Sequence, residues 1–262
     1  MHVLRQCILV CVGVWRGNRH SMTSALFLSA KWKNLVMINY EIDPSVLSSF
    51  IPKGTQLDLW NGKALISLVG FMFLDTYVHG VSIPFHRNFE EVNLRFYIKY
   101  NSPEGEHRGV AFIKEIVPRW GIAWLARLLY NENYVALPMR HLVEDQHSQI
   151  KAEYQWKFNG TWQKISVRCQ GNPRLPLPGS EAEFITEHYW GYSSQRDGET
   201  LEYQVKHPHW RIWEVDHCEM AVDIKNLYGS QFVPFLERQP VSSFLAEGSE
   251  VTVFKGLKLG SG

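Results

Sequence analysis

The stretch from Asn88 to Tyr100, NFEEVNLRFYIKY, alternates between apolar and polar residues as a long β-strand does. Successive side chains of a strand point to opposite faces of its sheet. One face would carry the apolar residues Val92, Leu94, Phe96 and Ile98. The other would carry a row of polar groups, namely Glu91, Asn93, Arg95, Tyr97 and Lys99. How this polar face is placed decides both the fold and the function.

Two interpretations of the polar face remain open from the strand alone. It is either the solvent face of an antiparallel sheet or the inner wall of a sheet that closes into a barrel around a ligand. In a barrel, Arg95 would bind an organic anion, with Asn93 and Tyr97 as further ligand-binding groups. Glu91 would then serve as a proton donor or acceptor.

The composition is that of a globular chain with a substantial core. The 262 residues are 45% hydrophobic, and 27 basic residues nearly balance 26 acidic ones. This balance gives no electrostatic footprint for nucleic acid or for a membrane surface, so a small-molecule partner is expected. The four scattered cysteines argue against a disulfide framework or a zinc ribbon and favour a cytoplasmic setting.

Residues 1–21 differ from the rest of the chain. They contain one apolar run, Cys7 to Trp15, which is too short to span a bilayer. The flank from Arg16 to His20 is basic and lacks a small-residue cleavage pattern. We therefore expect a disordered or non-native leader over 1–21, and a single domain over 22–262.

Short turns between apolar runs predict a mainly β (α+β) fold. Asn61-Gly62 predicts a hairpin joining Gln56–Trp60 to Ala64–Leu74, and Asn159-Gly160 predicts another joining Ile150–Phe158 to Trp162–Cys169. Short helices are expected after Asp43, over Gly121–Tyr130, after Ser180 and from Asp216 to about Gly229. Strands joined mostly to their neighbours favour an antiparallel sheet or closed barrel with a few peripheral short helices.

No motif for a nucleotide, a catalytic zinc or a serine nucleophile is present in the sequence, so no cofactor and no metal is expected. His207 and His209 alternate on an extended segment, where they are either surface groups or, for His207, part of a ligand site. Lys114 would form a Schiff base if it lay in a dry pocket. Alternation places Lys114 with Phe112 and Ile116, and the competing interpretation is a solvated strand end.

Five runs carry a resemblance to a known family: LDLWNGKALISLVGF, FEEVNLRFYI, GVAFIKEI, EFITEHYWGY and VKHPHW. In this order they resemble the uncharacterised YqjF-like family of bacterial proteins, which is assigned to the acetoacetate decarboxylase-like superfamily. The match covers roughly Leu26 to Leu259, and EVNLR with the later H-P-x-W is its more specific part. The resemblance implies a closed antiparallel β-barrel with a central cavity, and it favours the second interpretation of the polar face.

The same resemblance implies a departure from decarboxylase chemistry. In acetoacetate decarboxylases the Schiff-base lysine belongs to a Pro-Lys-Lys segment that follows a glutamate. Here the comparable segment is IKEIVPRW, in which Glu115 matches the glutamate and Arg119 stands in place of a lysine. Arginine stays protonated and is a poor nucleophile.

Three functions follow from these patterns. The first is a cavity protein that binds a small organic acid through Arg95 and Arg119, with Glu91 holding a hydroxyl or carbonyl. The second is a lyase or hydrolase that acts on a keto-acid-like substrate, with Glu91 or Glu115 as acid/base and Lys114 as the less favoured nucleophile. The third is a regulatory protein with an aromatic interaction surface. The superfamily resemblance also suggests a homo-oligomer.

Overall fold

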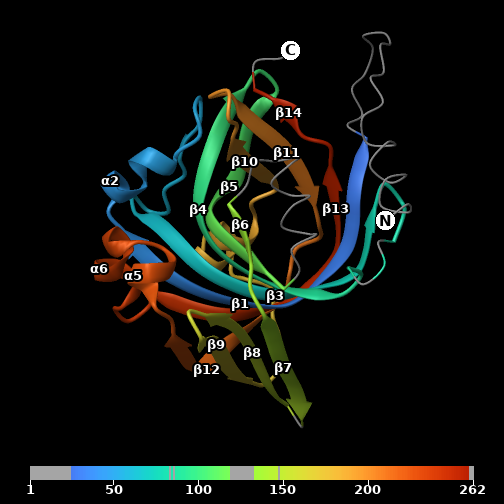
Figure 1. Cartoon of the computed structure of the whole chain (residues 1–262), viewed down its shortest axis with the longest axis vertical. Helices are drawn as coiled ribbons and strands as arrows, with labels where there is room; N and C mark the ends of the chain where they lie inside the picture. The colour runs from blue at the N-terminus through green and yellow to red at the C-terminus, as the bar shows by residue number, and fades with distance from the viewer. Residues whose placement is uncertain (1–24, 83, 85, 119–132, 147, 260–262) are drawn as a thin grey trace.

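The computed structural model of the chain describes residues 25–82, 84, 86–118, 133–146 and 148–259 (Figure 1). Several expectations lie outside these residues: the leader over 1–21, the helix over Gly121–Tyr130, and Arg119 with its ligand-binding role. Within the described ranges, no helix is long and apolar enough to cross a membrane.

Strands make up most of the described chain. The first half contains β1 (Leu26–Ile42), β2 (Gln56–Leu57), β3 (Ala64–Val78), β4 (Phe89–Ser102), β5 (Gly105–Val117), β6 (Tyr134–Ala136) and β7 (Met139–Gln146). The second half contains β8 (Gln149–Phe158), β9 (Thr161–Gln170), β10 (Trp190–Ser194), β11 (Thr200–Lys206), β12 (Ile212–Ala221), β13 (Ser242–Phe254) and β14 (Leu257–Lys258). The expectation of a mainly β chain is confirmed.

Seven of these strands pair in the order β11-β10-β5-β4-β3-β1-β13 and curve around a common interior (Figure 1). β11 also pairs with β13, through Val205–Val253 and Lys206–Thr252, so the order of pairing returns to its start. We call this set the strand ring. The sequence led us to expect a wholly antiparallel sheet. This expectation is wrong for β5, which pairs in parallel with both β10 and β6.

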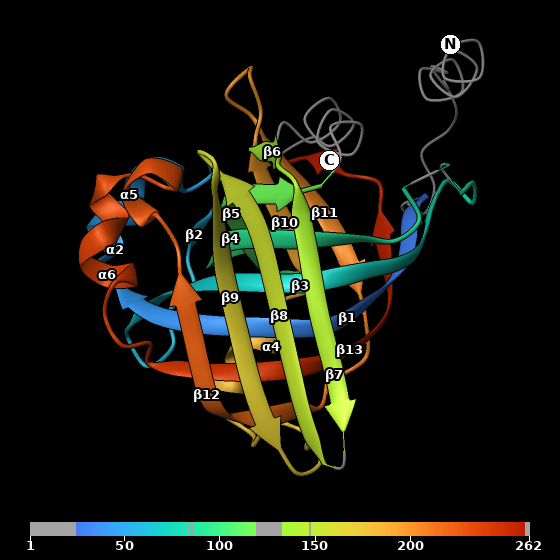
Figure 2. The same cartoon turned by 60° about the horizontal axis from the view of Figure 1, so that its bottom comes forward.

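A second layer lies across the outside of the strand ring. β12, β9, β8 and β7 continue the sheet beyond β13 and cross in front of β1, β3 and β4 (Figure 2). Asn159 and Gly160 turn β8 into β9 with φ of 47° and 81°, which confirms the predicted hairpin. Gly70 of β3 allows the two layers to approach closely, since a Cβ there would lie 2.8 Å from side-chain atoms of Ile165 and Tyr154.

The described chain also contains short helices. They are α2 (Pro44–Leu47), η1 (Ser48–Phe50), α4 (Glu181–Thr186), α5 (Ile224–Leu227), η2 (Ser230–Phe232) and α6 (Val233–Leu236). As predicted, Asp43 caps α2 and Ser180 caps α4, each by accepting a backbone N–H bond with its side chain. The helix expected from Asp216 is wrong, because Asp216 lies within β12 and Asp223 is the cap of α5.

The hairpin predicted around Asn61-Gly62 is only partly correct. The turn forms, with a bridge between Trp60 and Lys63, but β2 pairs with β4 and not with β3. Both edges of β3 are already occupied, because Ile66 pairs with Tyr40 on β1 and with Phe96 on β4. The apolar run of β3 is therefore central and covered on both faces, as its composition indicated.

Two hydrophobic clusters lie on the two sides of the ring wall. The cluster between the layers joins Leu94 and Phe96 of β4 to Tyr154 and Trp156 of β8. The interior cluster gathers residues of the strand ring and of α4, including Met37, Val69, Phe71, Tyr97, Phe184 and Phe244. β4 is thus buried on both faces, and its polar row lies on the interior side.

The packing between the layers can be tested at Trp156, whose side chain is fully buried there. We expect Trp156→Ala to lower the free energy of unfolding by about 3–5 kcal/mol, because it removes a large apolar side chain and leaves a cavity. Trp162→Ala, on the same hairpin but 37% exposed, is the matched control and should cost about 1 kcal/mol or less. Equal losses in urea denaturation would contradict this account of the layers.

Candidate functional site

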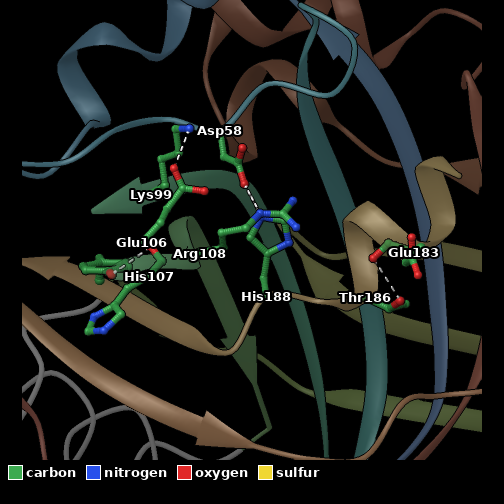
Figure 3. Close-up of polar contacts among 9 residues, drawn as sticks. Asp58, Lys99, Glu106, His107, Arg108, Glu183, Thr186 and His188 are labelled. Atoms are coloured by element: carbon green, nitrogen blue, oxygen red, sulfur yellow. Dashed lines mark hydrogen bonds and ion pairs between the residues drawn. The ribbon is translucent and has the colours of Figure 1, made fainter. Parts of the chain in front are cut away.

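The polar row of β4 is buried. The exposed fractions are 3% for Glu91, 2% for Asn93, 9% for Arg95 and 1% for Tyr97. The solvent-face interpretation is therefore wrong for these four residues. Lys99, the last member of the row, is half-buried at the end of the strand and forms an ion pair of 2.7 Å with Glu106 (Figure 3). Burying polar groups costs free energy unless they are hydrogen-bonded, so each buried member needs a partner.

Glu91 has two neutral hydrogen-bond donors. Asn93 Nδ2 donates to Glu91 Oε1 at 3.0 Å, and the Tyr134 hydroxyl donates to Oε2 at 3.4 Å. Burial raises the pKa of Glu91 to about 7, against the opposing effects of these two bonds and of the Arg95 guanidinium. A carboxyl group with this pKa exchanges protons readily near neutral pH.

Arg95 brings a positive charge into the interior. Its Cζ lies 5.9 Å from the centre of the Tyr97 ring, and its Nε is buried with no hydrogen-bond partner among the described residues. Asn93 Oδ1 is likewise buried and unpartnered there. One donor and one acceptor on neighbouring inward positions of β4 are thus left for a further group to satisfy.

Tyr97 is held by a chain of buried hydrogen bonds. Its hydroxyl lies 2.6 Å from Ser67 Oγ, and Ser67 Oγ donates to Asn39 Oδ1 at 2.6 Å. Asn39 Nδ2 donates in turn to Ser242 Oγ at 2.9 Å. These contacts cross β4, β3, β1 and β13 and fix the Tyr97 ring on the inner wall. Burial raises the pKa of Tyr97, so it remains a neutral phenol.

A second polar group lies against the same Tyr97 ring. His188, which follows α4 and is 8% exposed, has its ring centre 4.8 Å from that of Tyr97. Its Nε2 lies 3.0 Å from Asp58 Oδ2, and Arg108 Nε donates to the same oxygen at 2.6 Å (Figure 3). The Asp58 backbone N–H donates to Tyr97 O, which ties this group to β4.

The charges of this second group are set by burial and by the contacts of Asp58. Burial alone would raise the pKa of Asp58, but its bonds to His188 and Arg108 outweigh that effect and hold the pKa below its ordinary value. Burial lowers the pKa of His188 to about 4, although Asp58 opposes this shift. At neutral pH an Asp58 carboxylate therefore holds a neutral imidazole.

The two candidate catalytic residues of β5 lie on opposite faces. A β-bulge at Ile113 pairs Lys114 with Leu94 and Phe112 with Arg95. The predicted alternation, which placed Lys114 with Phe112, is therefore wrong. Glu115 pairs with Asn93 and shares the inward face of the ring wall.

Lys114 points away from the interior. Its Nζ donates to the backbone oxygen of Leu227 in α5 and lies 5.9 Å from the ring centre of Tyr228. Partial burial lowers the pKa of Lys114, as a nucleophilic lysine requires, but the amine is on the wrong side of β5 to meet a ligand beside Arg95. The structure does not bring Lys114 together with the other candidates.

His207 lies next to the interior cluster. Its ring stacks at 4.0 Å on Trp210, which is buried, and burial lowers its pKa. His209 points elsewhere and pairs with Glu187 at 2.8 Å, so the two histidines do not converge. Within the described ranges no group of three or more metal-ligating side chains is gathered.

A separate hollow lies on the outer face of β8, β9 and β12. Its charged lining residues are Lys151, Glu153, Lys164, Arg168, His217 and Glu219. Two ion pairs, Lys164–Glu219 at 2.7 Å and Lys151–Glu153 at 3.5 Å, satisfy part of this lining. The hollow is on the opposite side of the strand ring wall from Arg95, and we assign no role to it.

Sequence reasoning missed Asp58, His188 and Arg108 as parts of the interior site. Asp58 and His188 are separated by 130 positions, and no local pattern joins them. Asn39 and Ser67 were also missed, although each is a single polar residue within an apolar run, LVMINY in β1 and ALISLVGF in β3. Such isolated polar residues in strands covered on both faces are a signal that sequence analysis can use.

The pKa of Glu91 makes stability depend on pH. Its folded-state pKa of about 7 lies above the ordinary value of 4.5, so folding favours the protonated form. Glu91 therefore contributes most to the free energy of unfolding below pH 4.5. This contribution falls by about 3 kcal/mol in all as the pH rises through 7. Glu91→Gln should remove this loss, as measured by urea denaturation from pH 5 to 8. Glu104→Gln, at an exposed turn, should not change the pH profile.

The orientation of Lys114 predicts an absence of imine chemistry at this residue. Incubation with pyruvate or acetoacetate and borohydride should leave Lys114 unmodified, because its amine faces α5 and not the strand ring interior. Peptide mass mapping measures the outcome, with an acetoacetate decarboxylase as the positive control. A reduced adduct at Lys114 would show that β5 presents this residue differently in solution.

The fold has similar solved structures. An acetoacetate decarboxylase from Legionella pneumophila aligns with a TM-score of 0.62 at 12% identity, covering 97% of this chain and 95% of that one. The enduracididine biosynthesis enzyme MppR, complexed with pyruvate, aligns with a TM-score of 0.62 at 12% identity, covering 92% and 93%. These similarities support the acetoacetate decarboxylase-like fold expected from the sequence.

Sequence similarity leads to a family whose function is uncharacterised. The uncharacterized protein YqjF of Bacillus subtilis (strain 168) is 24% identical over 215 residues, which span 80% of this chain and 84% of that protein. The model of the DUF2071 family, described as an uncharacterized conserved protein, matches residues 29–250. This match covers most of the chain, and the chain therefore belongs to the DUF2071 family.

Proposed function

We propose that the strand ring is a closed barrel with a central cavity, and that this cavity binds a small organic acid. The observation that carries the proposal is Arg95, a cation that is 9% exposed and whose Nε has no partner among the described residues. A buried charge is costly unless an opposite charge or strong hydrogen bonds compensate for it. A carboxylate ligand would supply both, because arginine binds carboxylates through charge-assisted hydrogen bonds.

The groups around Arg95 could bind a second polar group of the ligand, in addition to its carboxylate. Asn93 Oδ1 is an acceptor without a partner among the described residues. Glu91, with its pKa of about 7, offers either a proton or a lone pair at neutral pH. One end of the ligand would thus carry the negative charge at Arg95, and its remaining polar groups would be held by buried groups along the inner wall, with Glu91 and Asn93 on one side of Arg95. The similar structure of MppR was solved with pyruvate, a small organic acid, which supports this choice of ligand class.

The pKa of Glu91 also favours an alternative, a lyase or hydrolase that acts on a keto-acid-like substrate. A general acid or base works best when its pKa lies near the working pH. Glu115 faces the same side of the wall and would be the second acid/base group. This enzyme would use no Schiff base at Lys114. If the parent protein turns over a keto acid and Glu91→Gln does not, the protein is an enzyme and not only a binding protein.

The organic-acid proposal is tested at Arg95. Carboxylates such as pyruvate, acetoacetate and lactate should raise the melting temperature of the parent protein. Arg95→Met should weaken their binding by about 10-fold to 100-fold, since a hydrogen bond to a charged group contributes about 1.5–3 kcal/mol. Titration calorimetry gives the affinities.

Arg168→Met is the matched control, because it removes an exposed cation from the outer face of β9. This variant should bind the acids as the parent does. Equal affinities in the parent and in Arg95→Met would overturn the proposal.

A further inference from the structure

His188 leaves one hydrogen-bonding atom unused inside the strand ring. Its Nε2 faces Asp58 Oδ2 at 3.0 Å, whereas its Nδ1 is buried and has no hydrogen-bond partner among the described residues. An unsatisfied polar atom in a buried position costs about 1–3 kcal/mol. Such an atom in a native protein calls for an explanation, and an absent ligand is one.

The chemical character of Nδ1 follows from the contacts of Asp58. Arg108 Nε donates to the same oxygen of Asp58 that faces His188, so this oxygen belongs to an ionised carboxylate, which only accepts hydrogen bonds. The Nε2 atom of His188 must therefore carry a hydrogen and donate it. With a pKa of about 4 the ring is neutral near pH 7, and its second nitrogen is then a bare acceptor.

This acceptor and the Arg95 cation both lie on the interior side of the strand ring. Both lie against the Tyr97 ring, with the His188 ring centre at 4.8 Å and Arg95 Cζ at 5.9 Å from the centre of that ring. The charged and titratable groups that face His188 are Asp58, Arg108, Arg95 and Tyr97. Phe184 closes another side of the imidazole, at 4.9 Å between ring centres.

The unpartnered atoms together indicate which hydrogen-bonding groups a ligand would need. Arg95 Nε needs an acceptor, whereas His188 Nδ1 and Asn93 Oδ1 each need a donor. A keto acid has only acceptor oxygens once its carboxyl group is ionised, and it would leave both acceptors unsatisfied. A hydroxylated acid supplies a carboxylate for the arginine and an O–H for a nitrogen or amide oxygen.

We propose that the organic acid bound inside the strand ring is a hydroxylated carboxylic acid, whose hydroxyl donates a hydrogen bond to Nδ1 of His188 while its carboxylate binds Arg95. This inference rests on the organic-acid function proposed above and specifies its ligand class. Asp58 and Arg108 act as positioning residues, because they fix which imidazole nitrogen faces the ligand.

The test compares hydroxy acids with the keto acids of the same carbon skeleton. The probes are L-lactate and D-lactate against pyruvate, and 3-hydroxybutyrate against acetoacetate, each titrated calorimetrically into the full chain. A site built to accept a hydrogen bond discriminates against a ligand that lacks the donor. We expect the parent to bind at least one hydroxy acid about tenfold more tightly than its keto partner.

Variants at His188 assign that preference to Nδ1. His188→Phe keeps an aromatic ring beside Tyr97 and Phe184 but removes the acceptor, so it should abolish the hydroxy-over-keto preference. His188→Asn retains a side-chain oxygen near the position of Nδ1 and should restore part of the preference. It also serves as the test if His188→Phe does not fold. His217→Phe, on the exposed face of β12, is the matched control and should behave as the parent.

The outcomes distinguish this inference from the function on which it rests. If acids bind in an Arg95-dependent manner but hydroxy and keto acids bind equally, the inference is overturned while the organic-acid function stands. A preference that persists in His188→Phe also overturns it. If none of the acids binds, both proposals fail.

Discussion

The need to satisfy polar groups inside a covered sheet governs this structure. β4 is buried on both faces, by the outer layer on one side and by the interior cluster on the other. Four polar side chains nevertheless project from its inner face. In such surroundings each polar atom must find a partner or reduce the stability of the fold. Most atoms of the row do find one. The exceptions among the described residues are Asn93 Oδ1 and Arg95 Nε.

The satisfied atoms explain how the site is held in place. The chain from Tyr97 through Ser67 and Asn39 links three neighbouring strands by side-chain hydrogen bonds. Asp58 does the same for the second polar group, since its carboxylate contacts His188 and Arg108 and its backbone N–H reaches Tyr97 O. Rotating the Tyr97 side chain would break its hydrogen bond to Ser67 and its ring contact with His188. The aromatic ring is thus a rigid reference against which the cation and the imidazole are placed.

The sequence predicted the local features of the fold well, because they depend on neighbouring residues. The Asn159-Gly160 turn, the Asp43 and Ser180 caps and the central position of β3 all follow from short-range chemistry. The pairing of β2 with β4 was not predictable, since it depends on which strand edges remain open once β1, β3 and β4 have assembled. The short β10 and β6 were also missed, since each pairs in parallel with β5, and no turn signal predicts such a pairing.

The site was predictable to the extent that it follows alternation along one strand. Glu91, Asn93, Arg95 and Tyr97 share a face of β4, as the two-residue period requires. In β5 the same rule failed for Lys114, because the bulge at Ile113 inserts one residue and exchanges the faces beyond it. One inserted residue thus turns the amine toward α5 and keeps the Glu115 carboxylate beside Asn93. Among the described residues, the buried inward positions of β4 and β5 therefore carry a guanidinium, an amide, a phenol and carboxyl groups, and the proposed ligand is inferred from the hydrogen-bonding atoms of these groups.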